Sequence, residues 1–319
     1  MPRPKSPPRP MSSKCAYVTL LTKPSYLAGV LVLDHCLRAV HSRYPLVVMI
    51  TSSLPEEARL VLRKRSIRTR EVKALDPPLH HTLASHDSRF ADTWTKLRGF
   101  ELVEYKRIVL LDCDMIVLKN MDELMAMDLP HDHIAAAHVC ACNPRGIEHY
   151  PIDWRPDNCA HTTLSHPTSL PPLPTHTSPR PHTQLNSGTV VLNPSKPLAA
   201  SIVHHLYTSP RVAEWKFPDQ DMLSEYFKGK WRPISWYYNA LRSLYNSHPT
   251  MWSEREIRCL HYIFADKPWQ SRRTPRGMEK GFDVMDKWWW ERFDALGESI
   301  ARADPTGWKF LLSTVDNSL

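Results

Sequence analysis

An alternation of buried strands and amphipathic helices near the start of the chain most constrains its fold. Residues 15–21 (CAYVTLL) and 45–51 (PLVVMIT) are apolar and rich in β-branched side chains, which is typical of strands buried on both faces. Between them, apolar residues recur at helical spacing over 26–40. A second helix is expected over 55–62 and a third strand over 66–72. This order predicts an α/β fold with a mostly parallel sheet and helices on both faces.

Two carboxylates stand at the end of a later predicted strand, in the stretch RIVLLDCDMIVLKN (107–120). A helix expected over 94–105 precedes this strand, which ends at Asp112 and Asp114. Ligands of open α/β sheets bind beyond the carboxyl ends of the strands, and a buried pair of carboxylates is costly without a partner. Two carboxylates at this spacing can present oxygens to one Mg²⁺ or Mn²⁺. The alternative is a solvated turn with two helix-capping aspartates, which the apolar strand disfavours.

The composition limits other ways of holding a phosphate. The chain has 319 residues, of which only 9 are glycine, and it contains neither GxGxxG nor GxxxxGKS/T. A glycine-rich phosphate cradle is therefore not expected. The net charge of +8 suits anionic ligands in general. However, Lys and Arg are scattered apart from a denser patch at 63–70, and no nucleic-acid-binding motif is present, so we predict no nucleic-acid partner.

The cysteines and the N-terminal residues bear on the cellular compartment. The 7 cysteines are an odd number without a CxxC pair, which disfavours a secreted disulfide framework. Residues 1–13 begin MPRPKSPPRP and lack the apolar core of a signal peptide. No apolar run approaches the ~18 residues of a membrane span. We predict a disordered tail over 1–13, a cytoplasmic protein and no transmembrane segment; the oligomeric state, a homodimer included, stays open.

A low-complexity insert occupies 160–183, which has no acidic residue and many Pro, Thr and His. This composition predicts an exposed loop, interpreted as a tolerated surface insertion, with a lid or acceptor-binding role as the alternative. One domain is expected over 14–303, followed by a C-terminal tail over 304–319. Beyond the insert we expect one strand and three helices, at 185–193, 198–207, 219–227 and 282–296.

Cysteine and histidine residues crowd the region just before and at the start of the insert. Thiolate and imidazole are the ligands of structural zinc, so a zinc site is one interpretation of this cluster. The spacings match no familiar zinc pattern, which makes this a secondary hypothesis. The residues concerned are His138, Cys140, Cys142, His149, Cys159 and His161.

Two enzyme classes place an aspartate pair at a strand end. Haloacid-dehalogenase-type phosphatases carry an aspartate nucleophile there, but on the first strand, whereas here three predicted strands come before Asp112. Glycosyltransferases that use nucleotide sugars have a central DxD motif for the metal that bridges the diphosphate. The other motifs of the chain favour the second class.

Five segments, in this order, resemble glycosyltransferase family 8 and within it the glycogenin and galactinol-synthase branch. They are YVTLLTKPSYLAGVLVL (17–33), WTKLRGFELVEYKRIVLLDCDMIVLKNMDEL (94–124), LNSGTVVLN (185–193), FPDQDML (217–223) and HYIFADKPW (261–269). The resemblance covers about residues 15 to 270, interrupted by the insert. It implies a single GT-A type domain, a UDP-sugar donor, Mn²⁺ or Mg²⁺, and transfer of a hexose to a hydroxyl acceptor with retention of configuration.

The resemblance also implies roles by position. The implied metal ligands are Asp112, Asp114 and His261, with Cys113 in the turn between the aspartates. The implied donor contacts are Leu20, Thr22 and Tyr26 at the uridine, Lys96 at the sugar or phosphate, and Asn186 and Ser187 at donor and acceptor hydroxyls. The implied catalytic residues are Asp219 and Gln220 beneath the donor sugar, and Lys267, which would stabilise charge on the leaving UDP.

The chain departs from the family pattern at several of these positions. Lys23 stands where asparagine is common, and Phe264 or Ala265 where a glycine is expected. Arg89, a candidate second basic contact, does not match in spacing. Lys216 replaces an aspartate of the glycogenins, which indicates a different acceptor, a carbohydrate or small polyol rather than a protein.

Two further interpretations remain open. Self-glucosylation would need a tyrosine near the site, and Tyr245 stands close to the separation expected from His261. We instead expect a separate acceptor, because tyrosines of this stretch are more often core residues. A degenerate scaffold that only binds nucleotide sugar is the second alternative, which the intact Asp112, Asp114, His261 and Lys267 disfavour.

Overall fold

A computed structural model describes residues 14–76, 92–270, 272 and 279–315. The predicted tail over 1–13 and the candidate contact Arg89 lie outside the described residues. In the described part, no helix has both the length and the apolar character needed to cross a membrane. The expected cytoplasmic location remains a prediction.

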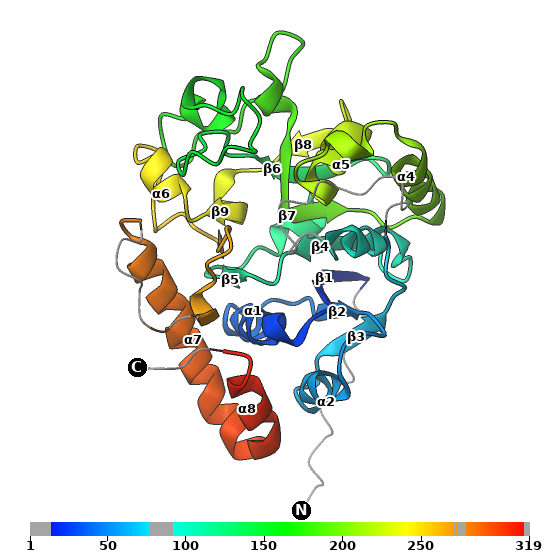
Figure 1. The fold of residues 1–319 in the computed structure, drawn as a ribbon, viewed down its shortest axis with the longest axis vertical. Coiled ribbons are helices and arrows are strands. Elements are labelled where there is room, and N and C mark those ends of the chain that lie inside the picture. Colours follow the sequence, from blue (N-terminus) through cyan, green and yellow to red (C-terminus); the bar gives the residue numbers. More distant parts are fainter. Residues whose placement is uncertain (1–13, 77–91, 271, 273–278, 316–319) are drawn as a thin grey trace, which may run out of the picture.

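Seven strands form the central sheet, in the order β3-β2-β1-β4-β7-β6-β8 (Figure 1). Strands β3, β2, β1 and β4 are mutually parallel, β7 runs antiparallel to both β4 and β6, and β8 is parallel to β6. The predicted α/β fold is thus confirmed, with one reversed strand. The strands are β1 (Cys15–Leu21), β2 (Leu46–Ile50), β3 (Arg68–Glu71), β4 (Arg107–Leu111), β6 (Ile134–His138), β7 (Leu185–Leu192) and β8 (Trp231–Pro233).

A second, three-stranded sheet stands beyond the end of β4, in the order β5-β10-β9. These strands were not predicted, because each has only two or three residues and no readable period. They are β5 (Met115–Val117), β9 (Ala240–Leu241) and β10 (Cys259–His261). Because β5 follows the aspartate pair directly, this small sheet brings C-terminal residues to the predicted site.

Helices cover both faces of the central sheet. Alternate residues of each strand enter opposite cores: Tyr17 and Val109 pack with α1, α2 and α7, whereas Ala16 and Ile108 pack with α4, α5 and the 3₁₀ helix Thr93–Glu101. The period of two thus produces two buried faces. The helices are α1 (Leu27–Ala39), α2 (Glu56–Lys64), α3 (Glu123–Ala126), α4 (Lys196–Thr208), α5 (Pro218–Tyr226), α6 (Leu244–Ser247), α7 (Phe282–Ala303) and α8 (Pro305–Leu312).

Two sequence expectations about these elements are corrected. The segment expected as a helix over 94–105 is a 3₁₀ helix, Thr93–Glu101, which ends before the expected Tyr105. The expected C-terminal tail contains α8, which packs on α7 and α2. The Asp304 side chain caps α8 by accepting from the Gly307 amide, and it pairs with Lys64 at 2.7 Å. Pro305 at the helix start ends α7 and begins α8, which is why the helical period breaks there.

The insert is exposed over much of its length but is anchored to the domain. Leu170 is 84% exposed and Leu173 72%. By contrast, Trp236 donates from its indole to the Pro167 carbonyl, and the His138 ring lies 2.9 Å from the Pro172 carbonyl. The interpretation as a surface insertion therefore holds for the exposed leucines in its middle, whereas Ala160, Leu164 and His182 near its two ends are buried.

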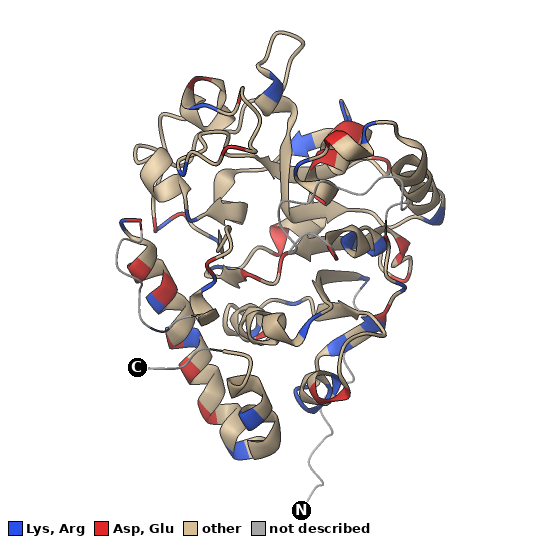
Figure 2. Cartoon of the chain, viewed as in Figure 1, with Lys and Arg blue, Asp and Glu red and all other residues tan. Residues whose placement is uncertain are grey.

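Charged side chains of both signs are interspersed over the described chain. Figure 2 shows acidic and basic residues side by side along α7. The basic patch at 63–70 falls on the end of α2 and on β3, whose residues are all exposed at the edge of the sheet.

Candidate active site at the carboxyl ends of β1 and β4

The turn that carries the two aspartates is held between the two sheets. Asp112 donates its backbone amide to the Gly188 carbonyl at 2.9 Å, and the Asp114 carbonyl accepts from the Tyr262 amide at 2.9 Å. Cys113 packs its carbonyl against α1 at Gly29, where an added Cβ would lie 2.3 Å from that oxygen. A glycine is needed there because the turn approaches the helix backbone.

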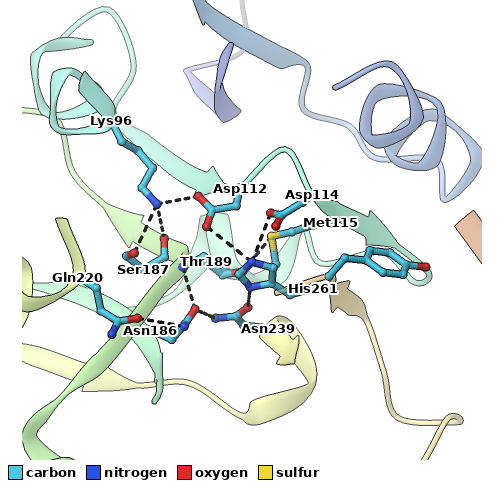
Figure 3. Close-up of polar contacts among 12 residues, drawn as sticks. Lys96, Asp112, Asp114, Met115, Asn186, Ser187, Thr189, Gln220, Asn239 and His261 are labelled. Carbon is cyan, nitrogen blue, oxygen red and sulfur yellow. Dashed lines mark hydrogen bonds and ion pairs between the residues drawn. The ribbon is translucent and has the colours of Figure 1, made fainter. Parts of the chain in front are cut away.

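Strand pairing places His261 beside the aspartate pair. In the β5–β10 register, His261 lies opposite Met115, the residue after Asp114. The imidazole Nε2 lies 3.3 Å from Asp114 Oδ1 and 3.7 Å from Asp112 Oδ2 (Figure 3). One ligand atom from each of the three residues lies within 4.8 Å of the others. Two carboxylates and an imidazole match the donor set of Mn²⁺ or Mg²⁺.

Two lysines flank this cluster. Lys267 donates to Asp114 Oδ2 and, at 2.7 Å, to the Tyr262 carbonyl. Burial acts to raise the pKa of Asp114, but Lys267 and His261 overcome it and hold that pKa well below its usual range. The carboxylate is therefore ionised and able to bind a cation.

Lys96 joins the aspartate pair to α5. Its Nζ lies 2.6 Å from Asp112 Oδ1 and 2.8 Å from Asp219 Oδ2, and it donates to the Ser187 carbonyl at 3.1 Å. Burial acts to lower the pKa of Lys96, but the two carboxylates raise it overall. The lysine is consequently a fixed positive charge between the cluster and Asp219. Figure 3 shows its contacts with Asp112 and Ser187.

A relay of amide side chains orients His261, and the member that contacts His261 was missed by the sequence reasoning. Asn239 Oδ1 lies 2.9 Å from His261 Nδ1, and Asn239 donates to Asn186 Oδ1 at 2.7 Å. Asn186 in turn donates to Gln220 Oε1 at 3.0 Å. Gly188 leaves room for the ring, since an added Cβ would lie 2.5 Å from it. No sequence signal marks Asn239, because its partners are remote in the chain.

A cavity of about 630 Å³ opens over these residues. All thirteen site residues predicted from the sequence line it, together with side chains that were not predicted. The thirteen are Leu20, Thr22, Tyr26, Lys96, Asp112, Cys113, Asp114, Asn186, Ser187, Asp219, Gln220, His261 and Lys267. The structure therefore brings every predicted position to one place; their roles remain proposals.

The wall expected to hold the uridine comes from the end of β1. Thr22 donates to Asp92 Oδ2 at 3.0 Å, and Lys23 pairs with the same carboxylate at 2.8 Å. Tyr26 stands edge-to-face on Trp269 with 5.5 Å between ring centroids. Lys23, which replaces the asparagine common in the family, is thus engaged by Asp92 within the cavity wall.

Aromatic residues that the sequence reasoning missed form another wall. Trp154 stacks on Phe217 with centroids 5.0 Å apart and planes at 12°, and Tyr150 meets Phe217 edge-to-face at 5.0 Å. The Trp154 indole donates to Gln184 at 2.9 Å, which fixes the ring. Flat apolar faces beside polar groups are typical of ligand pockets.

The two acidic residues of α5 have different surroundings. Asp219 faces Lys96, whereas Asp221 accepts the backbone amides of Lys216 and Phe217 at 2.8 and 2.9 Å. Burial raises the pKa of Asp221 to about 6, against the effect of these two hydrogen bonds. Asp221 therefore caps the start of α5, and Asp219 is the carboxylate directed at the site.

Tyr245 packs away from the cavity. Its ring meets Trp252 edge-to-face with centroids 5.7 Å apart and occupies the space beside Gly281, where an added Cβ would lie 2.6 Å from it. It is not among the residues that line the cavity. This placement agrees with the expectation that Tyr245 is a packing residue.

The fold and the family comparison place the chain among glycosyltransferases of the GT-A type. The model of the family described as "Glycosyl transferase family 8" matches residues 17–273. The chain belongs to this family.

Curated relatives in this family include galactinol synthases of plants. Galactinol synthase 1 of Solanum lycopersicum is 30% identical over 285 residues, which is 88% of this chain and 82% of the relative. Galactinol synthase 3 of Arabidopsis thaliana is 30% identical over 280 residues, covering 86% of this chain and 80% of the relative.

Solved structures resemble the fold at lower identity. The galactosyltransferase LgtC, in complex with donor and acceptor sugar analogs, superimposes with a TM-score of 0.61 at 16% identity, covering 90% of this chain and 99% of LgtC. The glycosyltransferase GlyE in Streptococcus pneumoniae TIGR4 has a TM-score of 0.54 at 17% identity, covering 95% of this chain and 66% of GlyE. These likenesses show a shared fold.

Proposed function

We propose that the protein transfers a hexose from a UDP-sugar to the hydroxyl of a small polyol or carbohydrate, with retention of configuration and with a divalent cation. The observation that carries this proposal is the grouping of ligand atoms from Asp112, Asp114 and His261 within 4.8 Å of one another. Lys96 and Lys267 flank this group, and all five residues line one cavity. Fixed positive charge beside a carboxylate–imidazole cluster suits a diphosphate leaving group.

Asp112, Asp114 and His261 would hold the cation, and their hard oxygens and single imidazole fit Mn²⁺ or Mg²⁺. When bound, the cation would neutralise the diphosphate oxygens and so make UDP a better leaving group. The Asn239 amide oxygen accepts from His261 Nδ1, which leaves Nε2 directed at the aspartates.

The remaining side chains would act on the sugar and the phosphate. Lys267 would stabilise negative charge as the bond between C1 and the diphosphate oxygen breaks. The acceptor oxygen forms its bond to C1 on the same face, and its proton leaves with the diphosphate. Gln220, held by Asn186 at 3.0 Å, would present its amide oxygen to the positive sugar centre, and Asp219, fixed by Lys96, would orient the sugar hydroxyls.

The relatives' name supports a small polyol as acceptor. Galactinol is a galactosylated inositol, so its synthesis joins a galactose donor to a cyclitol. The aromatic wall of Tyr150, Trp154 and Phe217 offers flat apolar surfaces to the C–H faces of such a ring. Lys216, in place of a glycogenin aspartate, and the packing of Tyr245 outside the cavity also favour a separate acceptor over self-glucosylation.

UDP release measured with Mn²⁺ tests the proposal. A panel of UDP-galactose, UDP-glucose and UDP-N-acetylglucosamine is assayed alone and with inositol, glycerol and monosaccharides, for wild type and Asp114→Asn. We expect turnover of one donor, stimulated by one acceptor and lost in Asp114→Asn.

A matched control is Asp132→Asn, an exposed aspartate paired with Lys230 at 2.9 Å. It should retain wild-type turnover. Absence of both hydrolysis and metal-dependent UDP binding in the wild type would refute the proposed reaction. UDP-sugar binding without any turnover would indicate the scaffold alternative, and a hexose covalently attached to Tyr245 by intact mass would indicate self-glucosylation.

A further inference from the structure

Three cysteines and one histidine converge outside the carboxylate cluster. Cys140 and Cys142 follow β6, Cys159 follows the 3₁₀ turn Pro156–Asn158, and His248 caps the C-terminal end of α6. Their four ligand atoms all lie within 4.8 Å of one another. Within the described residues, none of the cysteines forms a disulfide.

The distances within the cluster match a tetrahedral metal site. His248 Nε2 lies 3.6 Å from Cys140 Sγ, 3.2 Å from Cys142 Sγ and 3.5 Å from Cys159 Sγ. Zinc bonds of about 2.3 Å to sulfur and 2.0–2.1 Å to nitrogen, at tetrahedral angles, separate sulfur from nitrogen by about 3.6 Å. One imidazole nitrogen at nearly this distance from three sulfurs is difficult to explain by ordinary core packing.

We propose that Cys140, Cys142, Cys159 and His248 bind one structural zinc ion. Three thiolates and one imidazole form the Cys₃His set of structural sites, in which all four positions of the metal are filled by protein. On binding, the three thiols release their protons to solvent, and the ion remains Zn²⁺ throughout. Cys159 and His248 are buried, and Cys140 and Cys142 are partly exposed, so the metal has a route of entry.

The other histidines of the region are engaged elsewhere. His138 Nε2 lies 2.9 Å from the Pro172 carbonyl, and His161 Nε2 lies 3.2 Å from the His138 carbonyl. His149 meets the Tyr150 ring and lines the active-site cavity. Of the six candidates predicted from the sequence, the three cysteines are thus proposed ligands, and the three histidines contact other groups. The fourth proposed ligand is His248, which is remote in the sequence.

Zinc here would fix the wall of the active-site cavity. The segment 143–158 lies between the proposed ligands Cys142 and Cys159, and its members Asn143, Tyr150 and Trp154 line that cavity. His248 connects this segment to α6, in the C-terminal part of the domain. If the proposed reaction is correct, loss of zinc should therefore weaken acceptor binding more than the chemical step; the zinc site itself does not depend on that reaction.

Metal analysis of the full chain tests the site. Protein purified under reducing conditions is treated with EDTA, dialysed and analysed for zinc by mass spectrometry. We expect about one zinc per chain in the wild type and in Asp114→Asn, and less than about a tenth of that in Cys159→Ser and His248→Ala. Matched controls, Cys15→Ser and His166→Ala, lie outside the cluster and should keep the zinc.

Two further measurements use the wild-type protein, so they do not depend on whether the variants fold. Titration of the wild type with a mercurial thiol reagent should release zinc in step with modification of three cysteines. Cobalt exchanged into the protein should show thiolate charge transfer and the strong visible bands of a tetrahedral ion. Wild type without zinc, a disulfide between two of the three cysteines in protein isolated under native conditions, or zinc that disappears in Asp114→Asn would each overturn the proposal.

Discussion

Two side-chain clusters in the described part of the chain can hold a metal, and they offer different kinds of donor atom. Asp112, Asp114 and His261 offer hard oxygens and one nitrogen, with Lys267 and Lys96 in direct contact with the carboxylates. The cysteine cluster offers three sulfurs and one nitrogen. Hard donors favour Mn²⁺ or Mg²⁺, whereas thiolates favour zinc.

The clusters also differ in how completely the protein surrounds an ion. Three protein ligands leave coordination positions for the phosphates of a substrate, and the neighbouring lysines suit that negative charge. Four ligands fill the shell of a tetrahedral ion, so no substrate can reach it. Donor type and ligand number therefore distinguish a catalytic metal site from a structural one. In the sequence, each cluster was visible only as a short pattern of polar residues.

The largest expected effect follows from Asp114→Asn. Loss of one charged ligand should lower kcat/KM for UDP-sugar turnover by at least about 10³-fold, equivalent to about 4 kcal/mol of transition-state stabilisation. The zinc content should stay near wild type. Turnover that survives in this variant would show that the carboxylate cluster is not the catalytic metal site.

Cys159→Ser should lower the zinc content and the stability of the protein. Removal of one thiolate should lower the free energy of unfolding by roughly 2–5 kcal/mol, because binding of a structural metal contributes directly to folding. Urea denaturation followed by tryptophan fluorescence measures this loss, with Cys15→Ser as the control. Equal stability of Cys159→Ser and Cys15→Ser would contradict the structural role proposed for the cysteine cluster.

Asn239→Ala tests whether Asn239 orients His261 within the carboxylate cluster. Without its partner at Nδ1, His261 can rotate away from the aspartates, and residues that orient a metal ligand typically contribute 10–100-fold in metal affinity. The Mn²⁺ concentration for half-maximal UDP release should rise by that factor, whereas kcat at saturating Mn²⁺ should change less. An equal loss of kcat with unchanged Mn²⁺ dependence would contradict an orienting role.

The smallest effect concerns a group in neither cluster. Burial raises the pKa of Asp286 to about 7, although Arg242 lies 3.4 Å away and opposes the shift. Because the folded state binds the proton more tightly than the unfolded state, stability should fall as pH rises from about 4 to about 7 and be level above that. Asp286→Asn should remove about 1–2 kcal/mol of this dependence, measured by urea unfolding at pH 6 and pH 8. An identical pH dependence in wild type and variant would place its origin in other groups.

Much of the site was predictable from local pattern. The apolar run before Asp112 identified a strand end, and the order of five motifs identified the family and thirteen positions that line one cavity. The aromatic wall was missed because Tyr150, Trp154 and Phe217 lie in segments without a period, and their stacking depends on how those segments meet. The helix α8 was missed because Pro305 interrupts the helical repeat that marks α7.

The sequence alone determined the alternation of strands and helices, because residue spacing sets which side chains share a face and hydrophobicity buries that face. It also determined the donor atoms available to each metal. Only the tertiary structure decided which donors meet: His248 joins Cys159 across 89 residues, and Asn239 reaches His261 across 22. Such contacts depend on how whole elements pack, and no local spacing in the chain encodes the distance between them.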